Sequence, residues 1–177
     1  MITYVLKVIS DLASEIVVVV SSEEQAEAIR SSGALEGTGA EVVVDLDIGP
    51  KCPLLGLVSG LRALGGKEAI VLACDTPLVS KTVLSFLKEV LSYMNAAVPR
   101  WPNGYVEPLQ AVYRVREALR AGEELLKSEG PIDLRSFLRA LGRVRYISTR
   151  ILEELDPGLN TFLNVNTLAD LRRAEAV

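Results

Sequence analysis

The sequence contains no histidine, and this absence narrows the chemistry that the chain can perform. Histidine is the commonest general base in enzymes, a member of most serine triads and a frequent zinc ligand. If the chain is an enzyme, its carboxylates, amides, lysines or arginines carry the reaction. Carboxylates combined with Mg²⁺ are the natural candidates, because magnesium prefers oxygen ligands.

Other features are scarce as well. The two cysteines, Cys52 and Cys74, have neither a metal-ligand spacing nor the pattern of a disulfide framework. No basic block is present and the net charge is −4, so nucleic acid is not expected as a partner. No apolar run approaches the length that spans a bilayer, and Met1 leads directly into amphipathic sequence. We therefore expect a cytoplasmic protein that does not interact with membranes.

Apolar residues are plentiful enough for one folded domain. The chain has 177 residues, of which 49% are hydrophobic, and this suits a single domain over 1–177. Short apolar runs alternate with amphipathic segments that have the helical spacing of three and four residues. This alternation predicts an α/β fold, with a mostly parallel, Rossmann-like sheet flanked by helices on both faces. The expected strands are 15–20, 40–44 and 69–73, and the expected helices are 2–13, 22–33, 54–64 and 80–94. Ser22 and Ser80 are the expected caps of the second and fourth of these helices.

The stretch from Glu68 to Ser80 is the most informative part of the chain. Five apolar residues, Ala69–Ala73, predict a central parallel strand that is buried on both faces. The strand ends before Asp75, and Pro77 cannot continue its hydrogen-bond ladder. Open α/β sheets bind ligands at the carboxyl ends of their central strands, so Asp75 is the first candidate for a functional residue.

Two other expected strands also end in polar residues. Ser21 follows the strand over 15–20, and Asp45 follows the strand over 40–44. A single aspartate after a strand is an ordinary turn former, but two on one sheet edge favour a metal or polar-ligand site. We therefore expect Asp45 and Asp75 to open into one cleft. By itself this pattern predicts only an α/β domain with an acidic edge.

The second half of the chain has a different order of expected elements. A strand, a turn and a second strand predict an antiparallel pair, and helices and short strands follow. Thr167 and Asp170 have the spacing of a capping box for a closing helix. The expected strands are 95–100, 106–114, 144–147 and 162–165, and the expected helices are 116–127 and one that Asp133 caps.

Several polar groups have a plain structural interpretation when each is taken alone. Asn164 and Asn166 suit a strand exit before a helix, and Glu107 precedes a proline that an edge strand tolerates. Cys74 is better explained as a small core residue than as a nucleophile. Lys51 and Arg100 are the two cations expected in the loops, where most cations are simply solvated.

Four motifs become specific when they are considered together. Their order and spacing resemble the molybdenum cofactor guanylyltransferase family, within the larger group of GT-A-like nucleotidyltransferases. The resemblance extends over nearly the whole chain, and its most specific parts are the Cys-Asp-Thr-Pro and Asn-Val-Asn-Thr sequences. The motifs are 53–61 (PLLGLVSGL), 74–77 (CDTP), 107–113 (EPLQAVY) and 164–171 (NVNTLADL).

The resemblance implies an activity and assigns residues to it. Such enzymes transfer GMP from GTP to the terminal phosphate of molybdopterin carrying Mo or W, and they release pyrophosphate. By this similarity Asp75 would be catalytic and would hold the Mg²⁺ that bridges the triphosphate. Asp45 and Ser21 would contact the nucleotide. GTP and molybdopterin would be the partners of a monomer or small homo-oligomer.

The acceptor side is assigned in the same way. By the resemblance Asn164 and Asn166 would lie against the pterin, and Glu107 would line the cleft. A phosphate monoester is already largely ionised at neutral pH, so the nucleophile needs no strong base. Catalysis would then depend on positioning and on neutralising phosphate charge, which agrees with the absence of histidine.

The chain departs from this family at its start. The family begins with a strand and a glycine-rich loop, roughly Leu-Ala-Gly-Gly followed by Arg and Lys, which cradles the nucleotide phosphates. Here Met1 aligns with the family's first helix, so the domain is incomplete at its N-terminus relative to the family. We expect residues 1–177 alone to bind GTP·Mg²⁺ weakly and to transfer little GMP. We also expect the gap in the sheet to be filled by residues 1–9 or by another chain, because unpaired buried backbone groups are costly.

Three functional alternatives remain open at this stage. The chain is a guanylyltransferase whose sequence is incomplete, or a homologue without catalysis that acts as a binding or scaffold protein in cofactor maturation. The third alternative is a nucleotidyltransferase of the same fold that uses another nucleoside triphosphate.

Overall fold

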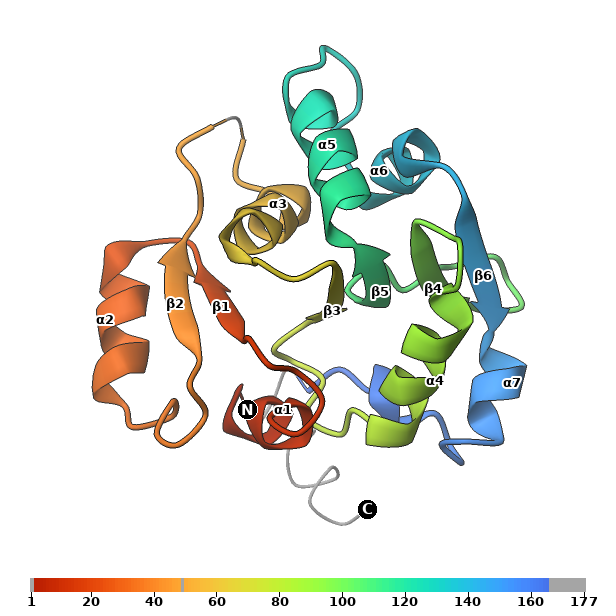
Figure 1. The fold of residues 1–177 in the computed structure, drawn as a ribbon, viewed down its shortest axis with the longest axis horizontal. Coiled ribbons are helices and arrows are strands. Elements are labelled where there is room, and N and C mark those ends of the chain that lie inside the picture. Colours follow the sequence, from red (N-terminus) through yellow and green to blue (C-terminus); the bar gives the residue numbers. More distant parts are fainter. Residues whose placement is uncertain (1, 49, 166–177) are drawn as a thin grey trace.

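The computed structural model describes residues 2–48 and 50–165 (Figure 1). Helices and strands alternate through the first half of the chain, as the sequence predicted. None of the described helices is both long and apolar enough to cross a membrane. The elements are α1 (Ile2–Ile9), β1 (Val17–Val20), α2 (Glu23–Ser31), β2 (Glu41–Val44), α3 (Pro53–Ala63), β3 (Glu68–Leu72), α4 (Lys81–Leu91), β4 (Ala96–Arg100), β5 (Gln110–Arg114), α5 (Val115–Leu126), α6 (Leu134–Leu141), β6 (Val144–Ser148), α7 (Thr149–Glu153) and a 3₁₀ turn, η1 (Asn160–Phe162).

The described strands form two sheets and not one. β1 and β2 pair in parallel, with Val17 opposite Glu41. The other four strands form a mixed sheet in the order β3-β5-β4-β6, in which β5 runs antiparallel to both neighbours and β6 runs parallel to β4. The α/β class is confirmed, but the expectation of a single, mostly parallel sheet is wrong. The sheet is mixed, and it is interrupted between β1 and β3.

β3 is an edge strand of its sheet, although the sequence predicted a central strand. It pairs with β5 on one side only. Ala69 is buried, but Ile70, Val71 and Leu72 are only half-buried and Glu68 is exposed. The reason is that a continuous apolar run indicates only that helices cover both faces of the strand. It carries no information about the number of strands that pair alongside.

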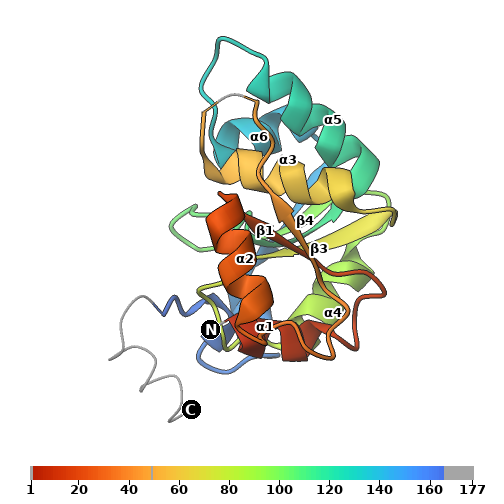
Figure 2. The ribbon, with the colours of Figure 1, turned by 90° about the vertical axis from the view of Figure 1, so that its left-hand side faces the viewer.

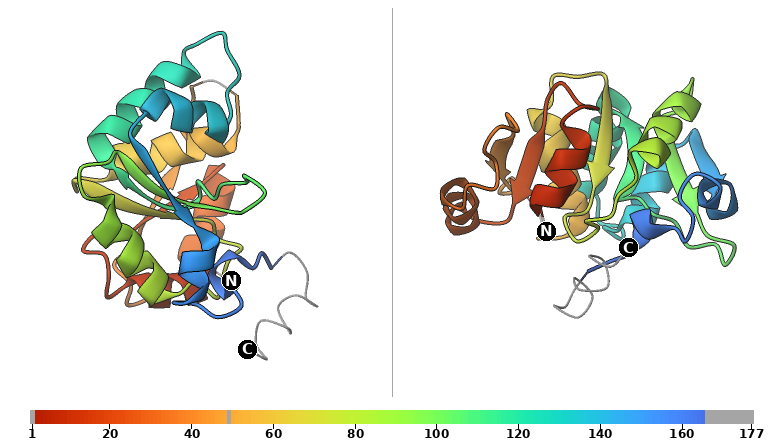
Figure 3. Two further views of the ribbon diagram at one scale, coloured as in Figure 1. Left: turned by 90° about the vertical axis from the view of Figure 1, so that its right-hand side faces the viewer. Right: turned by 90° about the horizontal axis from the view of Figure 1, so that it is seen from below.

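Helices cover both faces of the four-stranded sheet, as expected (Figures 2 and 3). On one face α3, α5 and α6 pack over a core that includes Tyr113 and Phe137. On the other face α4 and α7 contribute Leu87 and Leu152. The Tyr113 hydroxyl donates to the Pro108 carbonyl at 2.7 Å, and burial raises the pKa of this phenol well above its ordinary value.

Local sequence signals located most element boundaries. Ser22, Ser80 and Asp133 cap α2, α4 and α6 through their side-chain oxygens, as expected. The first helix is shorter than expected and ends at Ile9, whereas the sequence predicted a helix over 2–13. The short helix α7 was not predicted.

The last described segment differs from its prediction. The sequence predicted a strand over 162–165, but Asn160–Phe162 forms the 3₁₀ turn η1. Val165 is joined to the chain ahead of α4, because its N–H donates to the Asp75 carbonyl at 2.7 Å. The helix expected from Thr167 lies outside the described residues.

A cavity of about 910 Å³ separates β1 from β3. We call it the interstrand slot. It runs from Ile16 and Lys67 at one end of the two strands to Val20 and Cys74 at the other. α1 and α3 supply its other walls. Residues 2–9 therefore line the gap as a helix and do not fill it as a strand.

Candidate functional site

The carboxyl ends of β1, β2 and β3 lie at one edge of the molecule. Gly65, just before β3, donates its N–H to the carboxylate of Glu15, just before β1, at 3.0 Å. This bond brings the amino ends of β1 and β3 together, so their carboxyl ends share the opposite edge, and β2 is parallel to β1. Ser21, Asp45 and Asp75 follow the three strands at this edge, as the sequence predicted.

The two aspartates do not form a carboxylate pair. β1 and the interstrand slot lie between them, and no hydrogen bond or ion pair joins them within the described residues. In the same part of the chain, no cluster of three or more acidic or cysteine side chains could hold a metal ion. The structure thus places Asp45 and Asp75 on one edge without bringing their side chains together.

Ser21 is held from two sides at the end of β1. Its N–H and its hydroxyl both donate to Gln25 Oε1 at 3.0 Å. Lys51 Nζ donates to the Ser21 carbonyl at 3.1 Å. Lys51 therefore brings a positive charge to the same edge as the two aspartates, where it favours an anionic ligand such as a phosphate.

Asp45 has a buried carboxylate oxygen without a partner. Within the described residues its Oδ1 makes no hydrogen bond. This oxygen faces the first turns of α3, since a Cβ at Gly56 would lie 3.6 Å from it. Buried polar atoms are costly when they are unpaired, so this oxygen is available to accept a hydrogen bond from a ligand.

Asp75 lies three residues beyond β3 and is half-buried. Its carbonyl accepts the Val165 N–H, and the turn is fixed by the Thr76 hydroxyl, which donates to the Ala73 carbonyl at 3.0 Å. No side-chain bond or ion pair engages its carboxylate in the described part of the chain. The carboxylate of Asp75 fits Mg²⁺, which commonly binds one or two carboxylates together with phosphate oxygens.

The segment over 160–165 is anchored beside Asp75. Thr161 accepts the Ser80 N–H on its hydroxyl at 2.9 Å, and its own N–H donates to the buried Asp156 carboxylate at 2.7 Å. Asn164 is exposed and immediately precedes the residue that bonds to Asp75. Asn166, the other predicted acceptor residue, lies outside the described residues.

Glu107 approaches the same segment from the loop between β4 and β5. Trp101 Nε1 donates to Glu107 Oε1 at 2.6 Å, and the indole packs edge-on against Phe162 with 5.8 Å between ring centroids. Sequence reasoning missed Trp101 and Phe162. The one available signal was that Trp101 is the only tryptophan in the chain, but a lone aromatic residue in a turn has no spacing that indicates its role.

Two further groups were weighed in the sequence. Cys74 is exposed, so its interpretation as a core residue is wrong. Arg100 is the last residue of β4 and not a loop residue, and its guanidinium lies over the Tyr146 ring at 5.7 Å in a cation–π contact.

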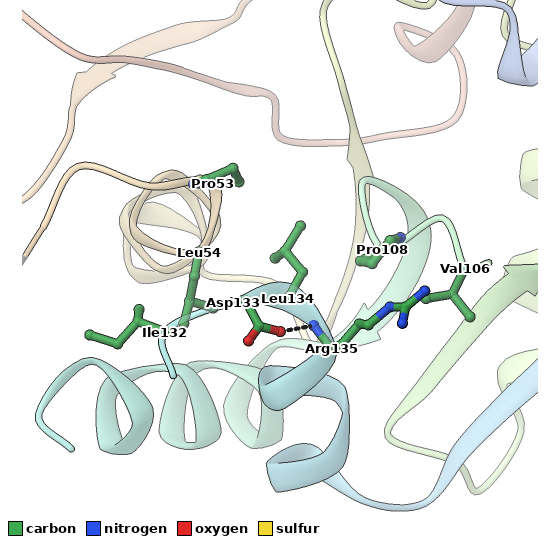
Figure 4. A pocket seen from close by; sticks show the side chains of 8 residues that line it. All are labelled: Pro53, Leu54, Val106, Pro108, Ile132, Asp133, Leu134 and Arg135. Atoms are coloured by element: carbon green, nitrogen blue, oxygen red, sulfur yellow. Dashed lines mark hydrogen bonds between the residues drawn. The ribbon is translucent and has the colours of Figure 1, made fainter. Parts of the chain in front are cut away.

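A second cavity of about 450 Å³ lies between the start of α3 and the start of α6 (Figure 4). Its polar groups are already engaged. The Asp133 carboxylate accepts the Arg135 and Ser136 N–H groups at 2.8 Å, which lowers the pKa of that carboxyl. The Arg135 guanidinium lies 5.3 Å over the Tyr105 ring. This cavity is therefore an apolar pocket without reactive groups of its own.

Comparison with known proteins identifies the family. Residues 1–144 match the model of the MobA-like NTP transferase domain. The chain belongs to this family. The resemblance inferred from the sequence motifs is therefore confirmed.

Relatives of the family carry a consistent name. A probable molybdenum cofactor guanylyltransferase of Thermococcus kodakarensis is 37% identical over 163 residues, covering 89% of this chain and 71% of that protein. A second, from Methanocaldococcus jannaschii, is 34% identical over 129 residues, covering 68% of this chain and 59% of that protein. The chain thus matches only about three fifths of the length of the second relative.

Solved structures of MobA-like and related proteins share the fold. The molybdopterin-guanine dinucleotide biosynthesis protein A of Archaeoglobus fulgidus has a TM-score of 0.74 and 31% identity, covering 97% of this chain and 83% of that chain. A 4-diphosphocytidyl-2C-methyl-D-erythritol synthase of Anaerococcus prevotii has a TM-score of 0.72 and 15% identity, covering 99% of this chain and 84% of that one. The second comparison is evidence of a shared fold alone.

Proposed function

We propose that this chain is a nucleotidyltransferase that moves GMP from GTP to molybdopterin, in its Mo or W form, and releases pyrophosphate. The observation that carries the proposal is the turn at Asp75, whose carbonyl accepts the Val165 N–H. Trp101, Glu107 and Phe162 contact one another beside this turn. The proposed site therefore has two neighbouring parts on one edge of the molecule, one for the nucleotide and one for the acceptor. Membership of the MobA-like family and the names of the relatives support the choice of nucleotide and acceptor.

The nucleotide part consists of residues at the ends of β1 and β2. Lys51 supplies a positive charge for the phosphates, and the unpaired Asp45 oxygen accepts a hydrogen bond from the guanosine. The Ser21 hydroxyl, which donates to Gln25, keeps its oxygen free to accept one as well. Asp75 would hold Mg²⁺, which when bound neutralises charge on the triphosphate.

The acceptor part consists of Glu107 and Asn164, with Asn166 proposed on sequence grounds. The acceptor phosphate attacks the α-phosphorus of GTP, a new P–O bond forms, and the bond to pyrophosphate breaks. The attacking oxygen is already ionised at neutral pH, so no proton moves and no histidine is required. The work of the protein is to orient the two phosphates and to offset their charge.

The test is a comparison of Asp75→Asn with the wild-type chain. We expect the variant to lose about 100-fold or more in pyrophosphate release from GTP with molybdopterin present, as is typical when a principal electrostatic stabiliser is removed. The same preparation is assayed with ATP and CTP, and GTP should support the fastest release. Binding of GTP with and without Mg²⁺ is measured by calorimetry, so that a low absolute rate does not hide the effect.

Asp47→Asn is the matched control. Asp47 is an exposed acid in the loop that follows β2, so its substitution changes the charge of the same edge by the same amount. It should leave both release and binding close to wild type. Equal losses in the two variants would reduce the role of Asp75 to general surface charge. An Asp75→Asn chain with wild-type turnover and wild-type Mg²⁺-dependent binding would contradict the proposal.

A further inference from the structure

We propose that Asp156, a buried acid in the connection between α7 and η1, is a positioning residue for the acceptor side of the site. This role rests on the proposed function, since it concerns the side chains that are proposed to lie against the acceptor. The observation that supports it is a series of contacts from Asp156 through η1 to Glu107.

Asp156 has lost most of its contact with water. Only 8% of the residue is exposed, and its Oδ2 accepts the Thr161 N–H at 2.7 Å. In the described part of the chain, no lysine or arginine forms an ion pair with it. A buried carboxylate is costly without compensating partners, so the bond to Thr161 strongly constrains both groups.

The bond to Asp156 fixes the start of η1. The Thr161 N–H belongs to the donors that a helical turn leaves unpaired at its start. The residue before the turn, Leu159, has the left-handed backbone angles φ 53° and ψ 40°, which residues other than glycine rarely adopt. The Asp156 carbonyl accepts the Leu159 N–H at 2.8 Å. The main chain and the side chain of Asp156 therefore both hold this turn in place.

Thr161 also attaches the turn to the chain that follows β3. The residue is fully buried, and its hydroxyl accepts the N–H of Ser80, the cap of α4, at 2.9 Å. Further along, the Val165 N–H donates to the Asp75 carbonyl at 2.7 Å. This segment, which contains Asn164, is therefore attached at both ends to the chain between β3 and α4.

Phe162 connects the turn to the acceptor side. It follows Thr161 directly, and its ring packs against the Trp101 indole with 5.8 Å between ring centroids. The indole N–H donates to Glu107 Oε1 at 2.6 Å. A displacement of η1 would therefore move Phe162 away from Trp101 and release Glu107 from its orientation.

The proposed nucleotide part is separate from this series of contacts. Ser21, Asp45 and Lys51 follow β1 and β2, and among the described residues none of them shares a hydrogen bond with 156–165. Loss of the Asp156 bond should therefore affect the acceptor and spare GTP. A cap that acted on stability alone would change neither Michaelis constant in the folded chain.

The experiment removes the acceptor oxygen at position 156 in the full chain. Asp156→Ala lacks this oxygen, and Asp156→Ser, whose side chain suits a turn, places its oxygen one bond nearer the main chain. In both variants we expect the KM for molybdopterin to rise about tenfold, since a hydrogen bond to a charged group is lost, and the KM for GTP to stay unchanged. Asp156→Asn retains an acceptor oxygen and should stay close to wild type. Pyrophosphate release is measured below the melting temperature of each variant, which circular dichroism determines.

Fluorescence supplies a second measurement that does not depend on turnover. Trp101 is the only tryptophan in the chain, so the emission reports the environment of the indole beside Phe162. In Asp156→Ala and Asp156→Ser the emission should shift to longer wavelength, and acrylamide should quench it more strongly. Glu154→Ala is the matched control, because it removes an exposed carboxylate from the same connection, and it should match the wild-type chain in both measurements.

The outcomes distinguish this role from the proposed function. A wild-type chain without pyrophosphate release would contradict the proposed function, and the emission would still test the link from Asp156 to Trp101. Turnover by the wild-type chain, together with folded Asp156→Ala and Asp156→Ser chains that keep its acceptor KM, would overturn the positioning role and leave Asp156 as a cap of η1. Equal increases in both Michaelis constants, or an unchanged tryptophan emission, would overturn it as well.

Discussion

At the scale of single residues, the contact between Trp101 and Glu107 fixes a carboxylate that we propose lies on the acceptor side. The carboxylate of Glu107 is half-buried and is held by the indole N–H at 2.6 Å, while the indole itself is packed against Phe162. A charge-assisted hydrogen bond of this length fixes the orientation of the carboxylate. If Glu107 contacts the acceptor, as we propose, Trp101 is a positioning residue that acts on the acceptor through Glu107.

We expect Trp101→Phe to raise the KM for the acceptor about tenfold and to leave the KM for GTP unchanged. The ring contact with Phe162 is largely retained, whereas the hydrogen bond to Glu107 is lost. Loss of such a bond also lowers the free energy of unfolding by about 1 kcal/mol. Steady-state kinetics with each substrate varied in turn, together with urea denaturation, measure both effects.

Tyr105→Phe is the control, since Tyr105 lies in the same turn, is 62% exposed and keeps its ring in the variant. It should behave like the wild-type chain. A Trp101→Phe chain that loses stability without any change in acceptor KM would limit Trp101 to a structural role.

At the scale of the elements, α6 depends on the cap that Asp133 provides. The backbone N–H and hydroxyl of Ser136 and the N–H of Arg135 donate to this carboxylate, which lowers its pKa. Because the folded pKa is below the unfolded value of about 3.9, the carboxylate stabilises the fold above that pH. The contribution decreases as the pH falls through the folded pKa.

We therefore expect Asp133→Ala to lower the melting temperature at pH 7 and to lower it less in acid. The difference between the wild-type chain and the variant should begin to shrink below about pH 4. Thermal denaturation followed by circular dichroism over pH 2.5–7 is the measurement. Asp133→Asn, which retains a capping oxygen, is the control and should be close to wild type at pH 7. A pH-independent difference would mean that the carboxylate charge contributes nothing.

The contact between α3 and α5 is the other element-scale feature that can be tested. A Cβ at Gly122 would lie 2.5 Å from Val58 Cγ2, so the two helices approach too closely for alanine. Gly122→Ala should lower the free energy of unfolding by about 1–3 kcal/mol, although alanine is the better helix former. Urea denaturation measures the change.

Gly56→Ala is a suitable comparison because it lies in α3 and its Cβ would meet Asp45 at an ordinary 3.6 Å. It should be neutral or slightly stabilising in the same denaturation experiment, by the helix propensity of alanine. If Gly122→Ala were also neutral, the two helices would have to be able to move apart at no cost.

These elements also show which features the sequence could predict. Caps such as Ser80 and Asp133 are local signals, so their helices were located correctly. The clash at Gly122 joins two residues that are far apart in the sequence, and no local pattern reveals it. The same distinction applies to the site. Asp75 directly follows an apolar run, so its place at the sheet edge was predicted, whereas the contacts of Trp101 are tertiary and were not.

At the scale of the whole molecule, the split between β1 and β3 divides the core. Leu6, Val18 and Ala26 belong to a hydrophobic cluster around the smaller sheet, which is separate from the cluster that contains Tyr113 and Phe137. No strand pairing connects the two sheets in the described residues. The connections that remain are α3 and α1, which each pack on both parts, and single bonds such as that between Gly65 and Glu15.

Such an arrangement predicts that the smaller sheet opens before the rest of the molecule. In native-state hydrogen exchange, amides of β1, β2 and α2 should exchange through a partial unfolding reaction with a small dependence on urea. Ala111 and Val112, in the strand between β3 and β4, should exchange only through global unfolding, about 100-fold or more slowly after correction for intrinsic rates. If all these amides instead showed one common free energy and one urea dependence, the chain would unfold as a single unit. The helices that pack on both sheets would then be sufficient to couple them.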